Sequence, residues 1–223
     1  MFTFLKRRAM AEPLFPLLRL IRHRMGTDGC GITTLAAGAG CPLHCHWCIN
    51  SRILAEGTPE MLNAQDFLER VIIDDLYFRA TGGGITFGGG EALLHAEFIC
   101  RFKEVCPPEW KITVETSLAV PVELLKLSLH AVDEYIVDCK DMNKEIYHRY
   151  TGGDGSLMYS NLSFLLKNAG SERVLIRVPA IPYYNTEDDR KSSVEILKKM
   201  GAVHLDLFDY IVREEIKKQA HTL

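Results

Sequence analysis

The stretch GITTLAAGAGCPLHCHWC, residues 31–48, joins a short β-like run to a loop that carries three cysteines. Residues 31–37 are predicted to form a strand, and Cys41, Cys45 and Cys48 follow it with the spacing CxxxCxxC. Three thiolates on one short loop can hold three irons of a [4Fe–4S] cluster, and this loop has no fourth cysteine. One iron would therefore be left open, and an open iron is a place where chemistry can occur.

Zinc is the alternative occupant of this loop, because it also binds thiolates and because His44 or His46 can supply a fourth ligand. Zinc sites usually draw their ligands from two separated pairs, and the sequence has no second CxxC and no HxxxH. The chain has seven cysteines, an odd number, and those outside the loop are scattered, as in proteins of a reducing cytosol. The spacing thus favours a cluster over zinc, and a disulfide least.

The composition is that of one α/β domain. The chain has 223 residues, 47% of them hydrophobic, and a net charge of −3, so we expect a sizeable core and no nucleic-acid partner. No run approaches the ~20 apolar residues of a membrane span. The basic, apolar start of the chain is interrupted by Pro13 and Pro16 and lacks a small-residue cleavage site, which argues against a secretory signal. We therefore expect a cytoplasmic monomer, with an N-terminal extension over residues 1–25 that packs on the domain or binds a partner, and one domain over residues 26–223.

Strand and helix patterns alternate along the chain from residue 31. The predicted strands are residues 31–37, 84–87, 110–115, 131–137, 173–180 and 203–208. The predicted helices are residues 64–80, 92–105, 120–129, 143–150, 157–168 and 188–200, with a last charged helix that runs to the C-terminus. Such a series implies a parallel sheet with helices outside, either curled into a partial barrel or open, and chemistry at the carboxyl ends of its strands. Polar residues at or just after these ends are Glu91, Glu115, Thr116, Asp138 and Lys140.

Several segments in order carry a family resemblance. The CxxxCxxC loop with an aromatic residue before its last cysteine resembles that of the radical S-adenosylmethionine (SAM) superfamily. Further segments resemble the activating enzymes of glycyl radical enzymes, such as the pyruvate formate-lyase activase: residues 26–32, 82–94, 115–117, 138–140 and 177–182. The resemblance covers roughly residues 26–208. It implies a partial (β/α)6 TIM-type barrel with parallel strands.

The resemblance also implies cofactors and partners. A [4Fe–4S] cluster on Cys41, Cys45 and Cys48 would bind SAM through the open iron, and one electron from the reduced cluster would divide SAM into methionine and a 5′-deoxyadenosyl radical. The radical would abstract hydrogen from a backbone glycine of a partner glycyl radical enzyme, with flavodoxin or ferredoxin as electron donor. The chemistry would be anaerobic. Two other functions stay open: a radical SAM enzyme acting on another peptide or a small molecule, and a non-catalytic iron–sulfur or zinc module.

The glycine-rich turn after the second predicted strand is the first candidate SAM contact. Gly88, Gly89 and Gly90 let the backbone approach a ligand closely, and Glu91 can accept hydrogen bonds from the SAM ammonium. A plain tight turn, with Glu91 starting a helix, is the alternative. The family has serine at the position of Gly88, so one side-chain contact would be lost.

Four further residues are implied to contact SAM. Asp138 would accept from the ribose hydroxyls and Lys140 would pair with the carboxylate, with a surface ion pair as the alternative. Arg177 lies within a strand, where a charge is costly unless paired, and would face the barrel interior and contact SAM. Trp47 would lie near the adenine, with core packing as its alternative.

The resemblance also implies a monovalent cation site, and one histidine of the family pattern is absent from this sequence. Glu115, Thr116 and Asp138 would together bind a monovalent cation through oxygen ligands, although Glu115 stands where the family has aspartate. After the sixth strand the family has Pro-Tyr-His, and this chain reads Asp-Tyr-Ile at 209–211, so that histidine is absent.

Overall fold

The computed structural model describes residues 12–210. The strands are β1 (Phe15–Met25), β2 (Ile32–Gly38), β3 (Glu60–Leu62), β4 (Gly84–Gly89), β5 (Lys111–Thr116), β6 (Glu134–Asp138), β7 (Val174–Ala180) and β8 (His204–Asp209). The helices are α1 (Ser51–Glu56), α2 (Ala64–Val71), α3 (Asp75–Thr81), α4 (Ala96–Val105), α5 (Val122–Ser128), α6 (Lys144–Thr151), α7 (Gly155–Ala169) and α8 (Glu187–Lys199). Short 3₁₀ helices are η1 (Ile72–Asp74), η2 (Ala92–His95) and η3 (Ser171–Arg173). The predicted C-terminal helix lies outside the described residues.

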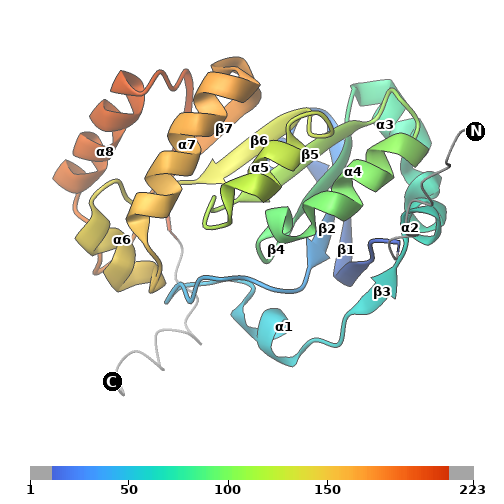
Figure 1. Cartoon of the computed structure of the whole chain (residues 1–223), viewed down its shortest axis with the longest axis horizontal. Coiled ribbons are helices and arrows are strands. Elements are labelled where there is room, and N and C mark those ends of the chain that lie inside the picture. The colour runs from blue at the N-terminus through green and yellow to red at the C-terminus, as the bar shows by residue number, and fades with distance from the viewer. Residues whose placement is uncertain (1–11, 211–223) are drawn as a thin grey trace, which may run out of the picture.

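All strands belong to one sheet of order β3-β1-β2-β4-β5-β6-β7-β8. The pairs from β2 to β8 are parallel, whereas β1 is antiparallel to both of its neighbours. Helices α4, α5 and α7 lie over one face of the strands (Figure 1). The predicted parallel α/β fold of a partial (β/α)6 barrel is thus confirmed, with β2 and β4–β8 as its six parallel strands.

The large apolar residues of β4 and β5 alternate along each strand, which assigns the two faces of the sheet. Ile85, Phe87, Ile112 and Val114 are fully buried and belong to the main core with residues of α4, α5 and α7, such as Phe102. Since successive side chains point to opposite faces of a strand, the residues between them lie on the other side. We call this opposite side, which carries Thr86, Thr113, Glu115, Asp138 and Arg177, the inner face.

The predicted helix over residues 64–80 is divided into α2, η1 and α3. The division falls at Asp74, whose side chain is almost fully buried. Its carboxylate accepts a hydrogen bond from Thr34 on β2 at 2.8 Å and pairs with Arg22 on β1. A buried carboxylate is costly without such partners, so these contacts explain why the chain turns here although the hydrophobic period continues.

Residues 15–25, within the predicted N-terminal extension, form the long antiparallel strand β1. Its first residue, Phe15, is fully buried, and its ring lies 5.1 Å from that of Phe98 and 5.3 Å from that of Phe87. Two arginines that obscure the strand pattern in the sequence have partners: Arg22 pairs with Asp74, and Arg24 binds Asp28 at 2.5 Å. The antiparallel strand therefore covers the edge of the parallel sheet beside β2.

The connection between β1 and β2, residues 26–31, crosses the inner face near the amino ends of the parallel strands. The carbonyl oxygen of Asp28 accepts from Thr86 on β4, and the N–H of Cys30 donates to Glu134 on β6 at 3.2 Å. Gly29 has φ +116°, and a Cβ there would lie 2.8 Å from Thr113 Oγ1 on β5. The connection therefore contacts three strands in succession and fills this end of the inner face.

Candidate active site

The three loop cysteines follow β2 at the carboxyl end of the sheet. They are free thiols, Cys41 exposed and Cys45 and Cys48 half-buried. Burial raises the pKa of the Cys45 thiol to about 11, and the other two thiols and Lys140 interact with it electrostatically. Within residues 12–210 no three His, Cys, Asp or Glu side chains are arranged as they would be around a bound metal ion. The loop presents separate thiols, the donor set that a multi-iron cluster takes.

Backbone hydrogen bonds hold the start and the middle of this loop. At its start, Glu91 N–H donates to the Gly40 carbonyl at 2.8 Å. In its middle, the N–H groups of His44 and His46 donate to the carbonyls of Thr151 and Tyr150 at the end of α6, at 2.8 and 3.1 Å. The rings of both histidines are exposed. The main chain of two other segments thus fixes the loop, and these hydrogen bonds do not involve its thiols.

The glycine-rich turn at the end of β4 packs closely on the segment that leads into the cysteine loop. A Cβ on Gly89, whose φ is +88°, would lie 2.7 Å from the Cβ of Ala37, and a Cβ on Gly90 would lie 2.1 Å from the carbonyl oxygen of Gly40. Asn50, just beyond the last cysteine, donates to the Gly89 carbonyl at 2.8 Å. These glycines therefore permit a close approach between two parts of the protein itself.

Glu91 is buried and its carboxylate is saturated with hydrogen bonds. Oε1 accepts from Thr116 Oγ1 at 2.6 Å and from the Leu93 N–H at 3.1 Å, while Oε2 accepts from the N–H and the hydroxyl of Ser117 at 2.8 and 2.6 Å. Burial raises the pKa of Glu91, and these bonds, which favour the ionised form, act in the opposite direction. Glu91 thus fixes the turn after β5 to the turn after β4.

Replacement of Glu91 by glutamine is expected to lower the free energy of unfolding by about 2–3 kcal/mol, because each carboxylate oxygen accepts one backbone N–H. Either orientation of the amide would place its NH₂ group against one of those donors. Urea denaturation followed by circular dichroism measures the effect. Glu97→Gln, at an exposed position in the first turn of α4, should change the value by less than about 0.5 kcal/mol. Equal values for the two variants would contradict this role of Glu91.

Asp138 and Lys140 form an ion pair at the end of β6. Lys140 Nζ lies 3.0 Å from Asp138 Oδ2, and the lysine side chain is 9% exposed. Burial alone would lower the pKa of Lys140, but Asp138 beside it raises this pKa above its ordinary value. The ammonium also lies 6.0 Å from the ring centre of Tyr210. A fixed cation thus stands within electrostatic range of Cys45 and Cys41.

Glu115 and Thr116 lie on β5, and Arg177 lies on β7, with β6 between these two strands. Arg177 Nη1 donates to Glu115 Oε1 at 2.8 Å, and Arg177 Nη2 donates to the Thr27 carbonyl. Burial raises the pKa of Glu115 to about 7, and Arg177 opposes this shift. The Thr116 hydroxyl donates to Glu91 and accepts from the Leu118 N–H at 2.9 Å. The predicted cation ligands are therefore already engaged with protein groups.

Trp47 is buried in a small aromatic cluster beside the cysteine loop. It packs with Tyr150 and Ile181, and its indole N–H donates to the Pro182 carbonyl at 3.2 Å. Tyr184 and Tyr210 pack against the same cluster. Tyr210 matches the tyrosine of the family's Pro-Tyr-His segment and lies near Lys140. The position of the missing histidine, residue 211, lies outside the described residues.

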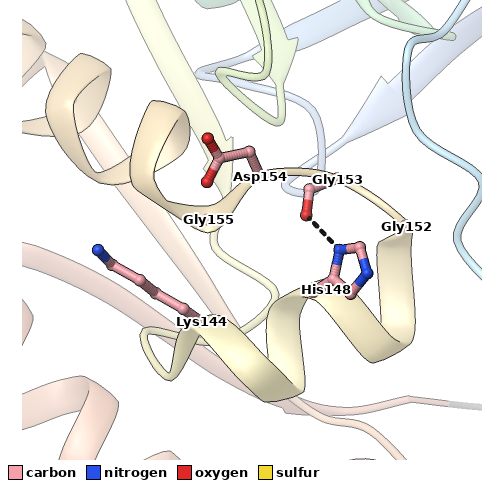
Figure 2. Close-up of a pocket in the computed structure, with 6 residues that line it drawn as sticks. All are labelled: Lys144, His148, Gly152, Gly153, Asp154 and Gly155. Atoms are coloured by element: carbon pink, nitrogen blue, oxygen red, sulfur yellow. Dashed lines mark hydrogen bonds between the residues drawn. The ribbon is translucent and has the colours of Figure 1, made fainter.

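A hollow lies behind the cysteine loop, at the junction of α6 and α7. Figure 2 shows it lined by Lys144, His148 and the turn 152–155, with His148 Nδ1 3.1 Å from the Gly153 carbonyl. A Cβ on Gly153 would lie 2.4 Å from Leu43 Cδ2 in the cysteine loop. The turn therefore supports the loop from behind, and none of the predicted site residues lines this hollow.

Two residues that position the site were not predicted from the sequence. Asn50 ties the end of the cysteine loop to Gly89, and Ser117 supplies two of the four donors to Glu91. Asn50 follows the last cysteine by two residues, and this proximity was the signal available for it. The Ser117 contact joins residues 26 positions apart, and nothing local to either residue indicates it.

A parallel half-barrel with a three-cysteine loop after its first parallel strand, a buried lysine and a glycine-rich turn defines an iron–sulfur enzyme of the partial-barrel class. Residues 36–207 match the family model of the radical SAM superfamily, and the chain belongs to this superfamily. The superfamily's cofactors are the [4Fe–4S] cluster and SAM, as the resemblance implied.

Three proteins similar to this chain are named as activating enzymes or as a domain of one. The (2S)-3-sulfopropanediol sulfolyase activating enzyme of Bilophila wadsworthia is 25% identical, over 82% of this chain and 81% of that protein. The pyruvate formate-lyase 1-activating enzyme of Escherichia coli K12 is 29% identical, over 82% of this chain and 76% of that protein. A solved domain of a pyruvate-formate lyase-activating enzyme from Bacteroides vulgatus is 25% identical with a TM-score of 0.50, over 63% of this chain and 91% of that one.

Proposed function

We propose that this protein is a glycyl radical enzyme activase. With a [4Fe–4S] cluster and SAM bound, it would supply the 5′-deoxyadenosyl radical that removes a hydrogen atom from a backbone glycine of a partner enzyme. The observation that supports this most is the loop of three free cysteines beside a buried lysine at the carboxyl end of a parallel sheet. Relatives that match across most of the chain are named as activating enzymes.

Different residues of this chain would bind the cluster and SAM. Cys41, Cys45 and Cys48 would hold three irons, and their separate, unpaired thiols fit that role. Lys140 is charged, buried and directed by Asp138, so it suits the carboxylate of SAM. Asp138, whose Oδ1 lies 4.0 Å from Arg177 Nη1, would accept from the ribose hydroxyls.

The glycine-rich turn and the aromatic cluster would bound the same space. Gly88, Gly89 and Gly90 set the turn, and Glu91 joins it to the turn after β5, so Glu91 would position SAM through these turns. Trp47, held by its hydrogen bond to Pro182, would form a wall near the adenine. With the cofactors bound, these groups would help to exclude water from the space next to the cysteine loop, which a reactive radical requires.

Partners and setting follow from the same proposal. The protein substrate would be a glycyl radical enzyme, the electron donor a flavodoxin or ferredoxin, and the working protein a cytoplasmic monomer. In residues 12–210, no helix is long and apolar enough to cross a membrane.

The test is anaerobic reconstitution with iron and sulfide, followed by incubation with SAM, a reductant and a panel of glycyl radical enzymes. We expect 5′-deoxyadenosine to form together with a glycyl radical signal in electron paramagnetic resonance on one member of the panel, and both should be lost in air. Deoxyadenosine without a glycyl radical, but dependent on an added peptide or small molecule, would indicate another radical SAM reaction. A protein that takes up zinc and binds no SAM would be a non-catalytic module.

A further inference from the structure

A row of charges crosses the inner face of the sheet where a monovalent cation was expected. Asp138, Arg177 and Asp206 are paired residues on β6, β7 and β8. Arg177 Nη1 lies 4.0 Å from Asp138 Oδ1, and its Nε lies 3.9 Å from Asp206 Oδ2. With the 2.8 Å bond to Glu115, the guanidinium is surrounded by three carboxylates, and 17% of its side chain is exposed.

The Glu115 carboxylate reaches Arg177 because two departures from the family pattern, at positions 88 and 115, fit each other. A Cβ on Gly88 would lie 2.6 Å from Glu115 Oε2, so the serine of the family would collide with the glutamate of this chain. Conversely, an aspartate at this position would withdraw its carboxylate by about 1.5 Å, the length of one C–C bond, away from Arg177. Glycine at 88 and glutamate at 115 are thus sterically linked, and together they bring a carboxylate to the guanidinium.

The oxygens of Thr116 and Asp138 already have protein partners, so they are poorly available as ligands of a cation. The Thr116 hydroxyl already donates to Glu91 and accepts from the Leu118 N–H. Asp138 pairs with Lys140 through Oδ2 at 3.0 Å and faces Arg177 through Oδ1. An alkali cation placed among Glu115, Thr116 and Asp138 would therefore meet two fixed positive charges at short range, so the residues present do not fit it.

We propose that the Arg177 guanidinium takes the place of a monovalent cation at this site, so that the protein works without bound potassium or sodium. Arg177 is then a positioning residue: it holds Glu115 and Asp138, and through Asp138 it orients Lys140. A guanidinium suits this task because its planar fork offers several fixed donors to several carboxylates at once. The inference rests on the proposed function only in that SAM binding is one of its readouts.

The experiment compares potassium chloride, sodium chloride and tetramethylammonium chloride at equal ionic strength, because the last cation is too large for a carboxylate site. The cluster-loaded protein is measured for its thermal midpoint and, by calorimetry, for its SAM dissociation constant. In the wild type we expect both quantities to be the same in all three salts, with the SAM constant changing less than about twofold. A wild-type midpoint or SAM constant that depends on potassium or sodium, with tetramethylammonium unable to replace them, would overturn the inference.

Arg177→Met supplies the complementary result. Without the guanidinium, Glu115 and Asp138 are left with a charge to neutralise, so potassium or sodium should raise the thermal midpoint and tighten SAM binding about tenfold over tetramethylammonium. Arg177→Lys keeps the charge, serves if the methionine variant does not fold, and should show no cation dependence. Lys111→Met is the matched control, because Lys111 forms a 3.0 Å pair with Glu134 on the same face but nearer the amino ends. It should also show none.

These outcomes separate the inference from the proposed function. If the protein binds no SAM in any salt, the proposed function fails, while the thermal midpoints still decide whether a cation binds. If SAM binds and no glycyl radical forms on any partner, the activase assignment fails and the role of Arg177 stands. A cation-independent Arg177→Met variant that folds normally would contradict the role proposed for the guanidinium.

Discussion

Replacement of Cys41, Cys45 or Cys48 by alanine is expected to remove the iron–sulfur cluster and to lower 5′-deoxyadenosine formation by more than about 10²-fold, because even the partners of metal ligands contribute about 10- to 100-fold. These thiols are free, and hydrogen bonds of the main chain fix the loop. The loss should therefore come from the missing ligand, with the fold retained. Iron and sulfide analysis, visible absorption and product quantification measure it.

The control is Cys30→Ala. Cys30 is also an exposed free cysteine, but it lies in the β1–β2 connection at the opposite end of the sheet. This variant should keep the cluster and its product yield. If it lost as much iron as the loop variants, or if a loop variant kept its full cluster, the assignment of the ligands would be wrong. Zinc in place of iron and sulfide would support the zinc alternative.

Replacement of Phe15 by alanine is expected to lower the free energy of unfolding by about 3–5 kcal/mol, the usual cost of removing a fully buried aromatic ring. The Phe15 ring is fully buried and lies within 5.8 Å of the rings of Phe67, Phe87 and Phe98. Urea denaturation of the apoprotein measures the effect. Leu14→Ala is the adjacent control, since Leu14 is 45% exposed and should change the value by less than about 1 kcal/mol.

This experiment also bears on the domain boundary. A loss below about 1 kcal/mol for Phe15→Ala would mean that the segment before residue 26 only rests on the domain. The expected larger loss would mean that β1 is part of the domain's core. Because Phe15 also packs against Gly38, with ring atoms within 3.0 Å of the position of a Cβ there, a loosened β1 should disturb the end of β2 and with it the approach to the cysteine loop.

The parallel sheet could be predicted from the sequence because each of its strands is a short apolar run followed by a helical period. Strand β1 could not, since Pro16 and the three arginines Arg19, Arg22 and Arg24 interrupt its apolar pattern. The structure shows what permits the charges: Arg22 pairs with Asp74, and Arg24 pairs with Asp28. Partners so far along the chain as Asp74 are set by the sheet register, which no local pattern contains.

The candidate site, too, could be predicted from the sequence only in part. The cysteines could be predicted as a site because their spacing is local. Glu91, Asp138 and Lys140 could be predicted to lie at one edge of the sheet because each lies at or just after the end of a parallel strand. What the sequence did not show is how these groups are already occupied. The four donors to Glu91 and the contact between Gly88 and Glu115 depend on the alignment of β4 with β5. Residue types therefore indicate where the site lies, whereas the pairing of its groups depends on the register of the strands.

The β1–β2 connection affects the side from which another molecule can reach the inner face. Its backbone contacts Thr86 and Glu134 towards the amino ends of the strands, so that rim is occupied by the chain itself. The thiols lie at the opposite rim, where the strands end and Cys41 is exposed, so a second molecule would approach them from there. A protein partner would then have to offer a protruding loop or a chain terminus, and would have to expose that piece first if its own fold buries it. The rate of that exposure would then limit how fast the two proteins can react.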